Sequence, residues 1–250
     1  MNPMPFNQLS GLKIFQFRNL SQIPWIGHAV STRDFGDVKN SREKFFKTIG
    51  VKEKDVADAQ QVHGNHVAIV DGNERGHVIL ETDALITNTP HVILLIKVAD
   101  CVPIMLVDSV HKVIGAVHAG WRGTVQEITR LTVQHMEDHF GTNPTDVIVG
   151  IGPSIGPCCY EVDTPVIEAF KKFSYADQLF TQKRNNHTYL NLWLANRFQL
   201  IEIGVKEKNI EVAERCTLDN TRLFFSERAE GKTGRIGAVI WIKNNPAIQF

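Results

Sequence analysis

Two histidines and one cysteine stand where predicted strands meet turns, although they lie far apart along the chain. They are His63 in residues 61–64 (Gln-Val-His-Gly), Cys101 in residues 99–103 (Ala-Asp-Cys-Val-Pro) and His118, which ends an apolar run. Two imidazoles and a thiolate suit Zn²⁺, and three protein ligands leave a fourth position open, as in catalytic zinc sites. A histidine beside a glycine is also common in turns, and a cysteine in an apolar run is common in cores. The residue types alone leave both interpretations open.

Residues 117–124 (Val-His-Ala-Gly-Trp-Arg-Gly-Thr) place a second kind of chemistry next to His118. The apolar run 113–117 predicts a strand before this segment, and the pattern over 125–139 predicts a helix after it. A helix start offers unpaired N–H groups, and Arg122 adds a planar cation that suits phosphate or carboxylate. The segment therefore predicts an anion site. The alternative is a tight turn in which Trp121 is buried and Arg122 is solvated.

The composition indicates a folded protein that is not a general nucleic-acid binder. The chain has 250 residues, 43% of them hydrophobic and 22% charged, and 27 basic residues balance 27 acidic ones. A general nucleic-acid binder usually carries a basic excess. Residues 1–11 show no signal-peptide pattern, and the longest apolar run, 92–105, is interrupted by Lys97, Asp100 and Pro103. We expect a cytoplasmic protein without a membrane partner, either a monomer or a small homo-oligomer.

The four cysteines predict no disulfide framework, because four are too few for a chain of this length and a cytosolic protein keeps its thiols reduced. Adjacent Cys158 and Cys159 also lack the spacing of a Cys-x-x-Cys metal pair. We expect these two residues to pack in the interior rather than take part in chemistry.

The elements that must position these residues do not alternate strictly between strand and helix, which favours an α+β fold over a doubly wound sheet. Periodicity and turn residues predict strands at 13–17, 27–32, 67–70, 84–87, 92–98, 104–107, 113–117, 146–151, 210–213, 223–226 and 236–242. They predict helices at 41–49 with Ser41 as N-cap, and at 125–139, 164–173 and 191–203. We expect 223–226 and 236–242 to pair as a hairpin, and the Gly- and Pro-rich segment 150–159 to form a rigid loop. No repeat or linker is visible, so we expect one domain over residues 1–250.

A set of motifs follows the order of a known family over nearly the whole chain. The motifs lie at residues 31–33, 61–64, 82–85, 99–104, 118–123, 152–162, 191–196, 216–217, 225–228 and 234–235. The sequence resembles the YfiH-like, or laccase-domain, family, whose members are described as polyphenol oxidases and purine nucleoside phosphorylases. Residues 118–123 (His-Ala-Gly-Trp-Arg-Gly) and 156–162 (Gly-Pro-Cys-Cys-Tyr-Glu-Val) are its most specific motifs.

The resemblance implies that His63, Cys101 and His118 form a metal or substrate site, usually with zinc, although copper is possible. It implies phosphorolysis of adenosine, inosine and S-methyl-5'-thioadenosine with phosphate, together with deamination of adenosine. It also implies packed, mixed β-layers flanked by helices, related to the fold of the cytotoxic necrotizing factor toxins.

These reactions assign expected roles to the motif residues. Phosphorolysis needs a phosphate seat, for which Arg122 is the candidate and Arg33 and Arg228 are alternatives, and a general acid for the leaving base, either His63 or His118.

In deamination, a metal-bound water would attack C6 of adenine, and Asp83 is the nearest motif carboxylate to move the proton. Asp83 fits equally well as a residue that caps a turn. Asp100 is expected either to orient a ligand histidine or to bond to nearby backbone.

The sequence departs from the family pattern at two places. After residues 31–33 the chain runs almost directly into the predicted helix at Ser41, which shortens one pocket wall, and Glu227 stands where an aromatic residue is common. Both changes bear on substrate preference.

Two other enzyme classes and a non-enzymatic binding or redox-sensing module are the alternatives to a purine nucleoside enzyme. A Cys–His hydrolase would use Cys101 as nucleophile and His118 as base. A copper polyphenol oxidase is disfavoured because the ten histidines include no His-x-His pair.

Overall fold

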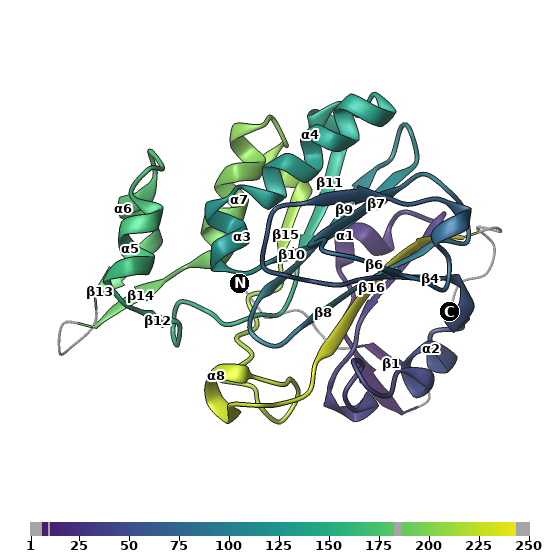
Figure 1. Ribbon diagram of the computed structural model, residues 1–250, viewed down its shortest axis with the longest axis horizontal. Helices are drawn as coiled ribbons and strands as arrows, with labels where there is room; N and C mark the ends of the chain where they lie inside the picture. Colours follow the sequence, from purple (N-terminus) through teal and green to yellow (C-terminus); the bar gives the residue numbers. More distant parts are fainter. Residues whose placement is uncertain (1–6, 10, 183–186, 244–250) are drawn as a thin grey trace.

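Two large β-sheets pack face to face in the computed structural model, which describes residues 7–9, 11–182 and 187–243 (Figure 1). The six-stranded sheet has the order β15 (Ile210–Val212), β11 (Val147–Ile151), β9 (Val102–Asp108), β10 (Val113–Ala119), β7 (Ala84–Thr87) and β5 (Val67–Ile69). The five-stranded sheet has the order β3 (Ile26–Val30), β16 (Ile236–Ile242), β8 (Ile93–Val98), β4 (Val56–Ala59) and β6 (Val78–Ile79). Both sheets mix parallel and antiparallel pairs. The predicted α+β fold of mixed β-layers is confirmed.

The alternation of side chains along the strands explains why the strands of the two sheets are so apolar. Ile104 and Leu106 of β9 face a core that includes the helices, whereas Met105 and Val107 face the core between the sheets. Successive strand side chains point to opposite faces, so a strand covered on both sides must be apolar throughout. All seven residues of β9 are buried accordingly.

Helices cover the outer faces of both sheets. Helices α3 (Trp121–Val125), α4 (Ile128–Phe140) and α7 (Leu192–Glu202) pack on the six-stranded sheet, and α2 (Glu43–Thr48) packs on the five-stranded sheet through Phe45 and Phe46. The short α1 (Arg18–Ser21) lies beside β11. The flanking helices that the resemblance implies are therefore present.

Smaller elements extend from this body. Strands β12 (Glu161–Val162), β14 (Thr188–Leu190) and β13 (Phe180–Gln182) form a third sheet, which projects to one side with α5 (Thr164–Phe170) and α6 (Ala176–Leu179) (Figure 1). Strands β1 (Asn7–Leu9) and β2 (Leu12–Ile14) form a hairpin, and α8 (Glu227–Glu230) precedes β16. In the described part of the chain, no helix is both long enough and apolar enough to cross a bilayer.

The predicted hairpin between 223–226 and 236–242 is wrong. Strand β16 pairs instead with β3 and β8, which come from distant parts of the sequence. Residues 223–226 form a turn and loop, because Ser226 caps α8 by accepting the N–H of Ala229 at 3.2 Å and Phe224 is completely buried. The apolar residues of this segment reflect burial rather than a strand.

Several boundaries also differ from the predictions. The predicted helix 125–139 is two helices, because Glu127 adopts a left-handed conformation with φ 62° between them. Strand β2 ends at Ile14, and α2 begins at Glu43 with Arg42, not Ser41, at its N-cap. The short buried strand β4 is absent from the predictions because it lacks a polar–apolar alternation.

Candidate active site

Asp83 organises the turn that carries His63. Its carboxylate accepts the backbone N–H groups of Val62 at 3.2 Å, His63 at 3.0 Å and Gly64 at 2.8 Å. His63 itself has φ 61°, a left-handed conformation that is uncommon for residues other than glycine. The three hydrogen bonds hold the turn in this conformation, and the imidazole of His63 extends from it into the site.

The same carboxylate orients His118 at the end of β10. Nδ1 of His118 donates to Oδ1 of Asp83 at 2.7 Å, and both residues are buried. The backbone N–H of His118 also donates to the carbonyl of Asp83 at 2.7 Å. An ionised carboxylate only accepts hydrogen bonds, so Nδ1 carries the proton and Nε2 is left to face the site.

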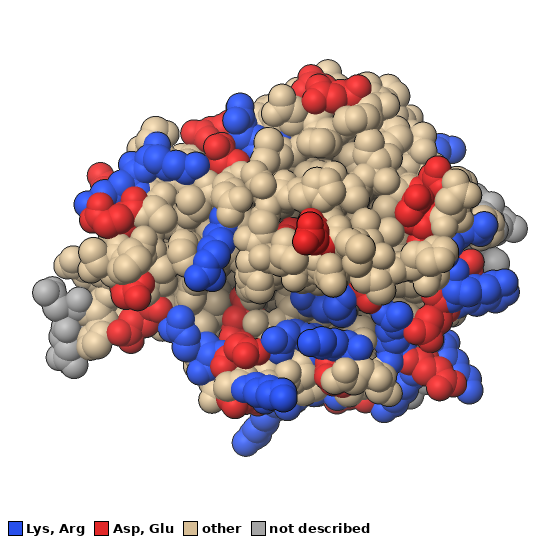
Figure 2. Space-filling view, in the orientation of Figure 1, with Lys and Arg blue, Asp and Glu red and all other residues tan. Residues whose placement is uncertain are grey.

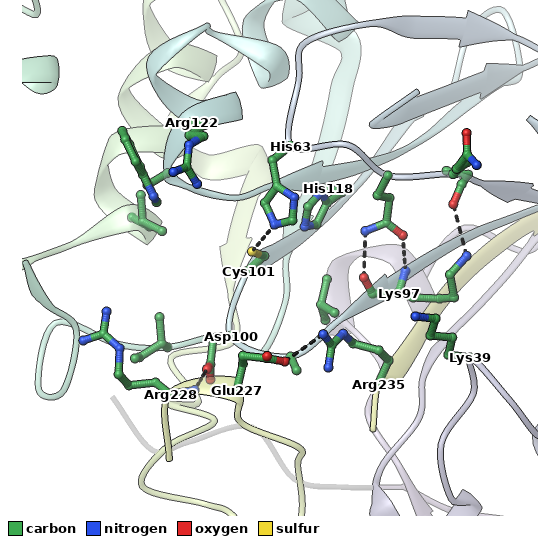
Figure 3. A pocket seen from close by; sticks show the side chains of 18 of the residues that line it. Lys39, His63, Lys97, Asp100, Cys101, His118, Arg122, Glu227, Arg228 and Arg235 are labelled. Atoms are coloured by element: carbon green, nitrogen blue, oxygen red, sulfur yellow. Dashed lines mark hydrogen bonds and ion pairs between the residues drawn. The ribbon is translucent and has the colours of Figure 1, made fainter. Parts of the chain in front are cut away.

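Cys101 completes the group from the turn between β8 and β9. Its Sγ lies 3.8 Å from Nε2 of His63, and the rings of His63 and His118 meet edge to face with centroids 4.8 Å apart (Figure 3). One donor atom from each of the three residues lies within 4.8 Å of the others. The structure therefore brings together the three residues that the sequence predicts as one site.

The charges of this group favour a thiolate beside an imidazolium when no metal is bound. Burial opposes ionisation of Cys101, but the charge and hydrogen bond of His118, with a hydrogen bond from His63, lower the pKa of the thiol to about 6. Burial likewise opposes protonation of His118, but the Cys101 thiolate and the Asp83 carboxylate raise its pKa to about 9. Asp83 stays ionised, because hydrogen bonds from His118 and Gly64 outweigh its burial and lower its pKa.

Two glycines of the segment 118–123 are required by close packing. A Cβ on Gly120 would lie 3.0 Å from Sγ of Cys101 and 3.1 Å from Cδ2 of His63. A Cβ on Gly123 would lie 2.9 Å from the carbonyl oxygen of Gly64. The first turn of α3 thus rests directly on the Asp83-bound turn, and glycine is the residue that permits this approach.

The three residues line a pocket of about 950 Å³ at the ends of both sheets. The face drawn in Figure 2 is hollowed below its centre, and Lys and Arg side chains gather along the hollow. In Figure 3, Arg122 and Arg228 lie to one side of Cys101, and Lys97, Arg235 and Lys39 lie to the other. The pocket is therefore cationic although the chain carries no net charge.

The cations of this pocket differ in whether an acid neutralises them. Lys97 is paired with Asp58, and Arg235 is paired with Glu227 at 2.7 Å. No carboxylate among residues 7–9, 11–182 and 187–243 forms an ion pair with Arg122 or Arg228. Their guanidinium groups lie over aromatic rings instead: Arg122 over Trp121 at 4.5 Å and Arg228 over Tyr160 at 5.3 Å.

Arg33, the third predicted anion-binding arginine, does not line this pocket. It is ion-paired with Glu230, donates from Nε to the carbonyl of Phe224 at 2.9 Å and lies 4.2 Å over the ring of Phe225. These contacts occupy its guanidinium in holding the segment before β16.

The helix that follows His118 begins earlier than the predicted residue 125. Helix α3 begins at Trp121, has only five residues, and so places Arg122 in its first turn. The anion-binding potential of the segment thus comes from the side chain of Arg122.

Residues 27–243 match the family model described as multi-copper polyphenol oxidoreductase laccase. The chain belongs to this laccase family.

Proteins named for activities other than laccase are similar to this chain over most of their length. A purine nucleoside phosphorylase of Bacteroides thetaiotaomicron is 39% identical over 201 residues, which cover 77% of this chain and 74% of the relative. Adenosine deaminase RL5 from an unknown prokaryotic organism is 34% identical over 216 residues, 82% of each chain. The crystal structure of YlmD from Geobacillus stearothermophilus superposes with a TM-score of 0.87 at 28% identity, covering 96% of this chain and 99% of that one.

The three-residue site of this laccase-family chain fits a zinc ion chemically. Nε2 of each imidazole and Sγ of Cys101 supply three nitrogen and sulfur donors, and the Asp83 hydrogen bond fixes His118 in the tautomer that a ligand requires. The same donor types also suit copper.

Asp100 has the second of its two expected roles, because its carboxylate bonds away from the imidazoles. It accepts the hydroxyl of Thr217 at 2.6 Å and the backbone N–H of Arg228 at 2.7 Å. Asp100 thereby ties α8, including Arg228, to the turn that carries Cys101.

Tyr160 and Gln61 line the pocket but are missing from the predicted site. Burial and the nearby Cys101 thiolate raise the pKa of Tyr160 to about 12, so its phenol stays neutral. Gln61 holds β8 through paired hydrogen bonds with the backbone of Lys97, at 2.7 and 2.9 Å. Gln61 lies in the motif 61–64 and Tyr160 lies in the motif 156–162. Their place in these motifs is the sequence signal that could have identified them as pocket residues.

Proposed function

We propose that this protein is a purine nucleoside phosphorylase that acts on adenosine, inosine and S-methyl-5'-thioadenosine with phosphate, and that it also deaminates adenosine. The observation that carries the proposal is the coincidence, in one pocket, of His63, Cys101 and His118 with two arginines that no described carboxylate pairs. The names of the similar proteins support both activities.

Phosphorolysis requires that an oxygen of phosphate form a bond to C1′ of the nucleoside while the C1′–N9 bond breaks. The electron pair of the broken bond leaves with the purine, which takes up a proton, and the products are the free base and ribose 1-phosphate. Arg122 and Arg228 would bind the phosphate, because guanidinium groups match its geometry and charge. When no metal is bound, His63, which is exposed to the pocket, would supply the proton to the base.

Asp83 fits a positioning role better than a proton shuttle. Its carboxylate is completely buried behind His118 and bonded to the turn 62–64, so the imidazole separates it from the pocket. A proton would have to pass through His118 to reach it. A zinc ion held by His63, Cys101 and His118 would supply Lewis-acid polarisation next to the bound nucleoside.

The test is product formation from adenosine, inosine and S-methyl-5'-thioadenosine with and without phosphate. We expect free base and ribose 1-phosphate, or its 5-methylthio analogue, only when phosphate is present, and inosine from adenosine by deamination. Base release that does not depend on phosphate concentration would contradict phosphorolysis. Metal analysis of the purified protein identifies zinc or copper in the same preparation.

The anion seat has a matched control within the chain. Arg122→Met and Arg228→Met should each raise the KM for phosphate about 10- to 100-fold, the loss of one charge-assisted hydrogen bond. Arg33→Met should leave this KM unchanged, because Arg33 is engaged with Glu230 outside the pocket. A rise in KM in all three variants would point to a general electrostatic effect instead.

A Cys–His hydrolase is the second candidate, and the thiolate character of Cys101 favours it. Asp83 bonds to His118, and His118 in turn interacts with Cys101, which is the arrangement of an orienting acid, a base and a nucleophile. Full activity after chelation, together with a covalent substrate adduct on Cys101, would support this hydrolase over the phosphorylase.

A further inference from the structure

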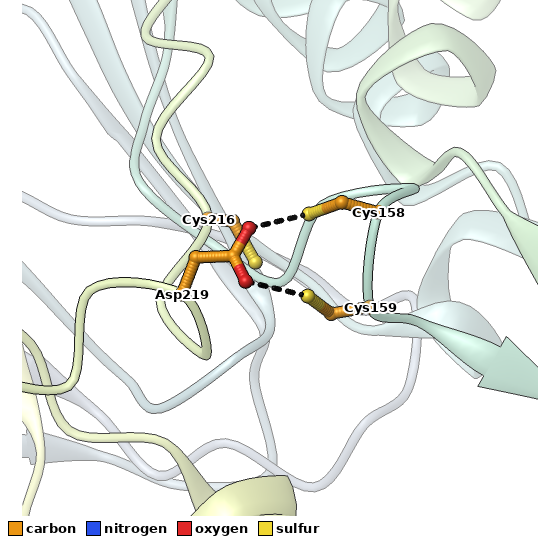
Figure 4. A group of neighbouring side chains, drawn as sticks. All are labelled: Cys158, Cys159, Cys216 and Asp219. Atoms are coloured by element: carbon orange, nitrogen blue, oxygen red, sulfur yellow. Dashed lines mark hydrogen bonds between the residues drawn. The ribbon is translucent and has the colours of Figure 1, made fainter.

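Three cysteines and one aspartate gather at a second place, away from the pocket. Cys158 and Cys159 belong to the loop that follows β11, and Cys216 and Asp219 belong to the loop that follows β15 (Figure 4). One donor atom from each residue lies within 4.8 Å of the other three. None of the four lines the pocket that contains Cys101.

The carboxylate of Asp219 points into this group. It accepts a hydrogen bond from Sγ of Cys158 on one oxygen and from Sγ of Cys159 on the other, both at 3.0 Å. Cys216 is buried, whereas Cys158 and Asp219 are exposed, so the group is open to ions from solution. The expectation that Cys158 and Cys159 pack in the interior is wrong, because Cys158 is exposed and Cys159 is only partly buried.

The backbone around the cluster is held independently of any ion. The N–H of Thr217 donates to the carbonyl of Ser154 at 3.0 Å, and the amide of Asn220 donates to the carbonyl of Cys216 at 2.8 Å. A Cβ on Gly156 would lie 2.7 Å from the ring of Trp193 and 3.2 Å from Cβ of Cys216. The two loops are therefore locked at close range by hydrogen bonds and packing.

The donor set is that of a structural zinc site. Thiolates select thiophilic ions such as Zn²⁺, and four protein ligands leave no position open for substrate. Zn–S bonds of about 2.3 Å place sulfur atoms roughly 3.8 Å apart in a tetrahedron, so side-chain rotation alone can bring these donors onto one ion. The N–H of Gly156 points at Sγ of Cys216 at 3.2 Å, the kind of hydrogen bond that supports a ligand thiolate.

We propose that Cys158, Cys159, Cys216 and Asp219 bind a second divalent, thiophilic cation, best suited to Zn²⁺, in a closed four-ligand site. Each thiol releases its proton to solvent as its bond to the ion forms, and no electron transfer is involved. The site is separate from His63, Cys101 and His118, and it does not depend on the function proposed above.

The position of the cluster indicates what this ion would do. One loop continues into Tyr160, which lines the pocket, and the other contains Thr217, which donates to Asp100 next to Cys101. An ion that joins the two loops would reinforce the hydrogen bonds and packing that already hold this wall of the pocket.

The test uses the full chain with His63→Ala and Cys101→Ser, which together remove two donors of the first site. Co²⁺ is titrated under reducing conditions, because tetrahedral cobalt–thiolate coordination has a distinctive absorption spectrum. We expect one Co²⁺ per chain, thiolate-to-cobalt charge-transfer bands, and displacement by Zn²⁺. If this protein shows no saturable binding with thiolate bands, the proposal is overturned.

Single substitutions then locate the ion. Cys158→Ser and Asp219→Ala affect exposed side chains and should weaken Co²⁺ binding more than about 10-fold, whereas Asp177→Ala, an exposed acid elsewhere, should not. Circular dichroism checks that each variant is folded. Equal affinity in the Cys158 and Asp177 variants would overturn the assignment, as would a reduced protein that binds no Co²⁺ but forms a disulfide among these cysteines in air.

Discussion

Asp83 determines the geometry of the site because its single buried carboxylate accepts four hydrogen bonds. It holds the turn 62–64 and orients His118, so one residue links two of the three donors. Asp108 offers a close comparison in the same protein. It is also completely buried and accepts two turn N–H groups and Nδ1 of His111 at 2.9 Å, but it does not line the pocket.

Asp83→Asn should therefore impair function specifically. An amide in place of the carboxylate presents an NH₂ group to the imidazole or the turn, and so disturbs the orientation of His118. We expect losses of about 10- to 100-fold in activity and in metal affinity, measured by steady-state kinetics and metal competition. Asp108→Asn serves as the control and should lose stability but keep activity. Equal losses of activity in both variants would show that Asp83 acts only through folding.

The pKa of Cys101 predicts unusual reactivity for the metal-free protein. Because the pKa of the thiol is lowered to about 6, the thiolate fraction and the rate of alkylation by iodoacetamide should rise with pH and reach half of the plateau near pH 6. His118→Gln should move this midpoint up toward about 8.5, the ordinary value of a cysteine. Peptide mass spectrometry identifies the alkylated residue. A wild-type midpoint above pH 8 would contradict the thiolate–imidazolium pair.

At the scale of elements, the site forms where several chain segments end close together. The turn before β5, the turn between β8 and β9, the end of β10 and the start of α3 each contribute one part (Figure 3). Gly120 lies at their junction, with φ −72° and ψ 171°, a conformation open to any residue. This position therefore requires glycine because there is no room for a side chain, and not because of its backbone conformation.

Gly120→Ala should damage the site while leaving the fold intact. The added methyl group would press on Cys101 and His63, and a displacement of catalytic groups approaching 1 Å costs about 100-fold in rate. The change in unfolding free energy should stay within about 1 kcal/mol, since alanine suits this backbone conformation. Gly72→Ala is the control, with its nearest neighbouring atom 3.8 Å from the added carbon. Thermal unfolding and kinetics are measured on both, and wild-type activity in Gly120→Ala would contradict the packing argument.

For the whole molecule, the core between the two sheets contains a buried histidine. His28 on β3 is 3% exposed, accepts the N–H of Phe17 on Nε2 at 2.8 Å and stacks on its ring. Burial is the main cause that lowers the pKa of His28 to about 3. The imidazole is therefore neutral in the folded protein and becomes protonated readily only after unfolding.

This histidine should make the fold sensitive to acid. The unfolded chain takes up a proton below its ordinary pKa of 6.5, so the stabilising contribution is complete above that pH and is lost as the pH falls toward 3. The expected loss is about 1.4 kcal/mol per pH unit, or about 2 kcal/mol between pH 6.5 and 5. Urea unfolding of the wild type and of His28→Gln, which keeps an acceptor but does not titrate, measures the difference. Parallel pH profiles for the two proteins would show that His28 is not responsible.

Local sequence determined a large part of the elements and the identity of the central residues. Strand β7 and strand β16 have the predicted boundaries, because their continuous β-branched and aliphatic residues leave no competing structure. The family resemblance predicted that His63, Cys101 and His118 form one group, and the structure brings them together in a pocket that Arg122 and Arg228 also line. Strand boundaries and motif matches depend on short segments, so they can be predicted from the sequence.

Tertiary structure alone decided which segments meet. The pairing of β16 with β3 and β8, the engagement of Arg33 with Glu230, and the approach of Asp219 to three cysteines all join residues far apart in the chain. The hydrophobic effect specifies that a segment is buried but not against which partner. The partner is chosen by close packing and by the pairing of buried polar groups, and these exist only once the whole chain has folded.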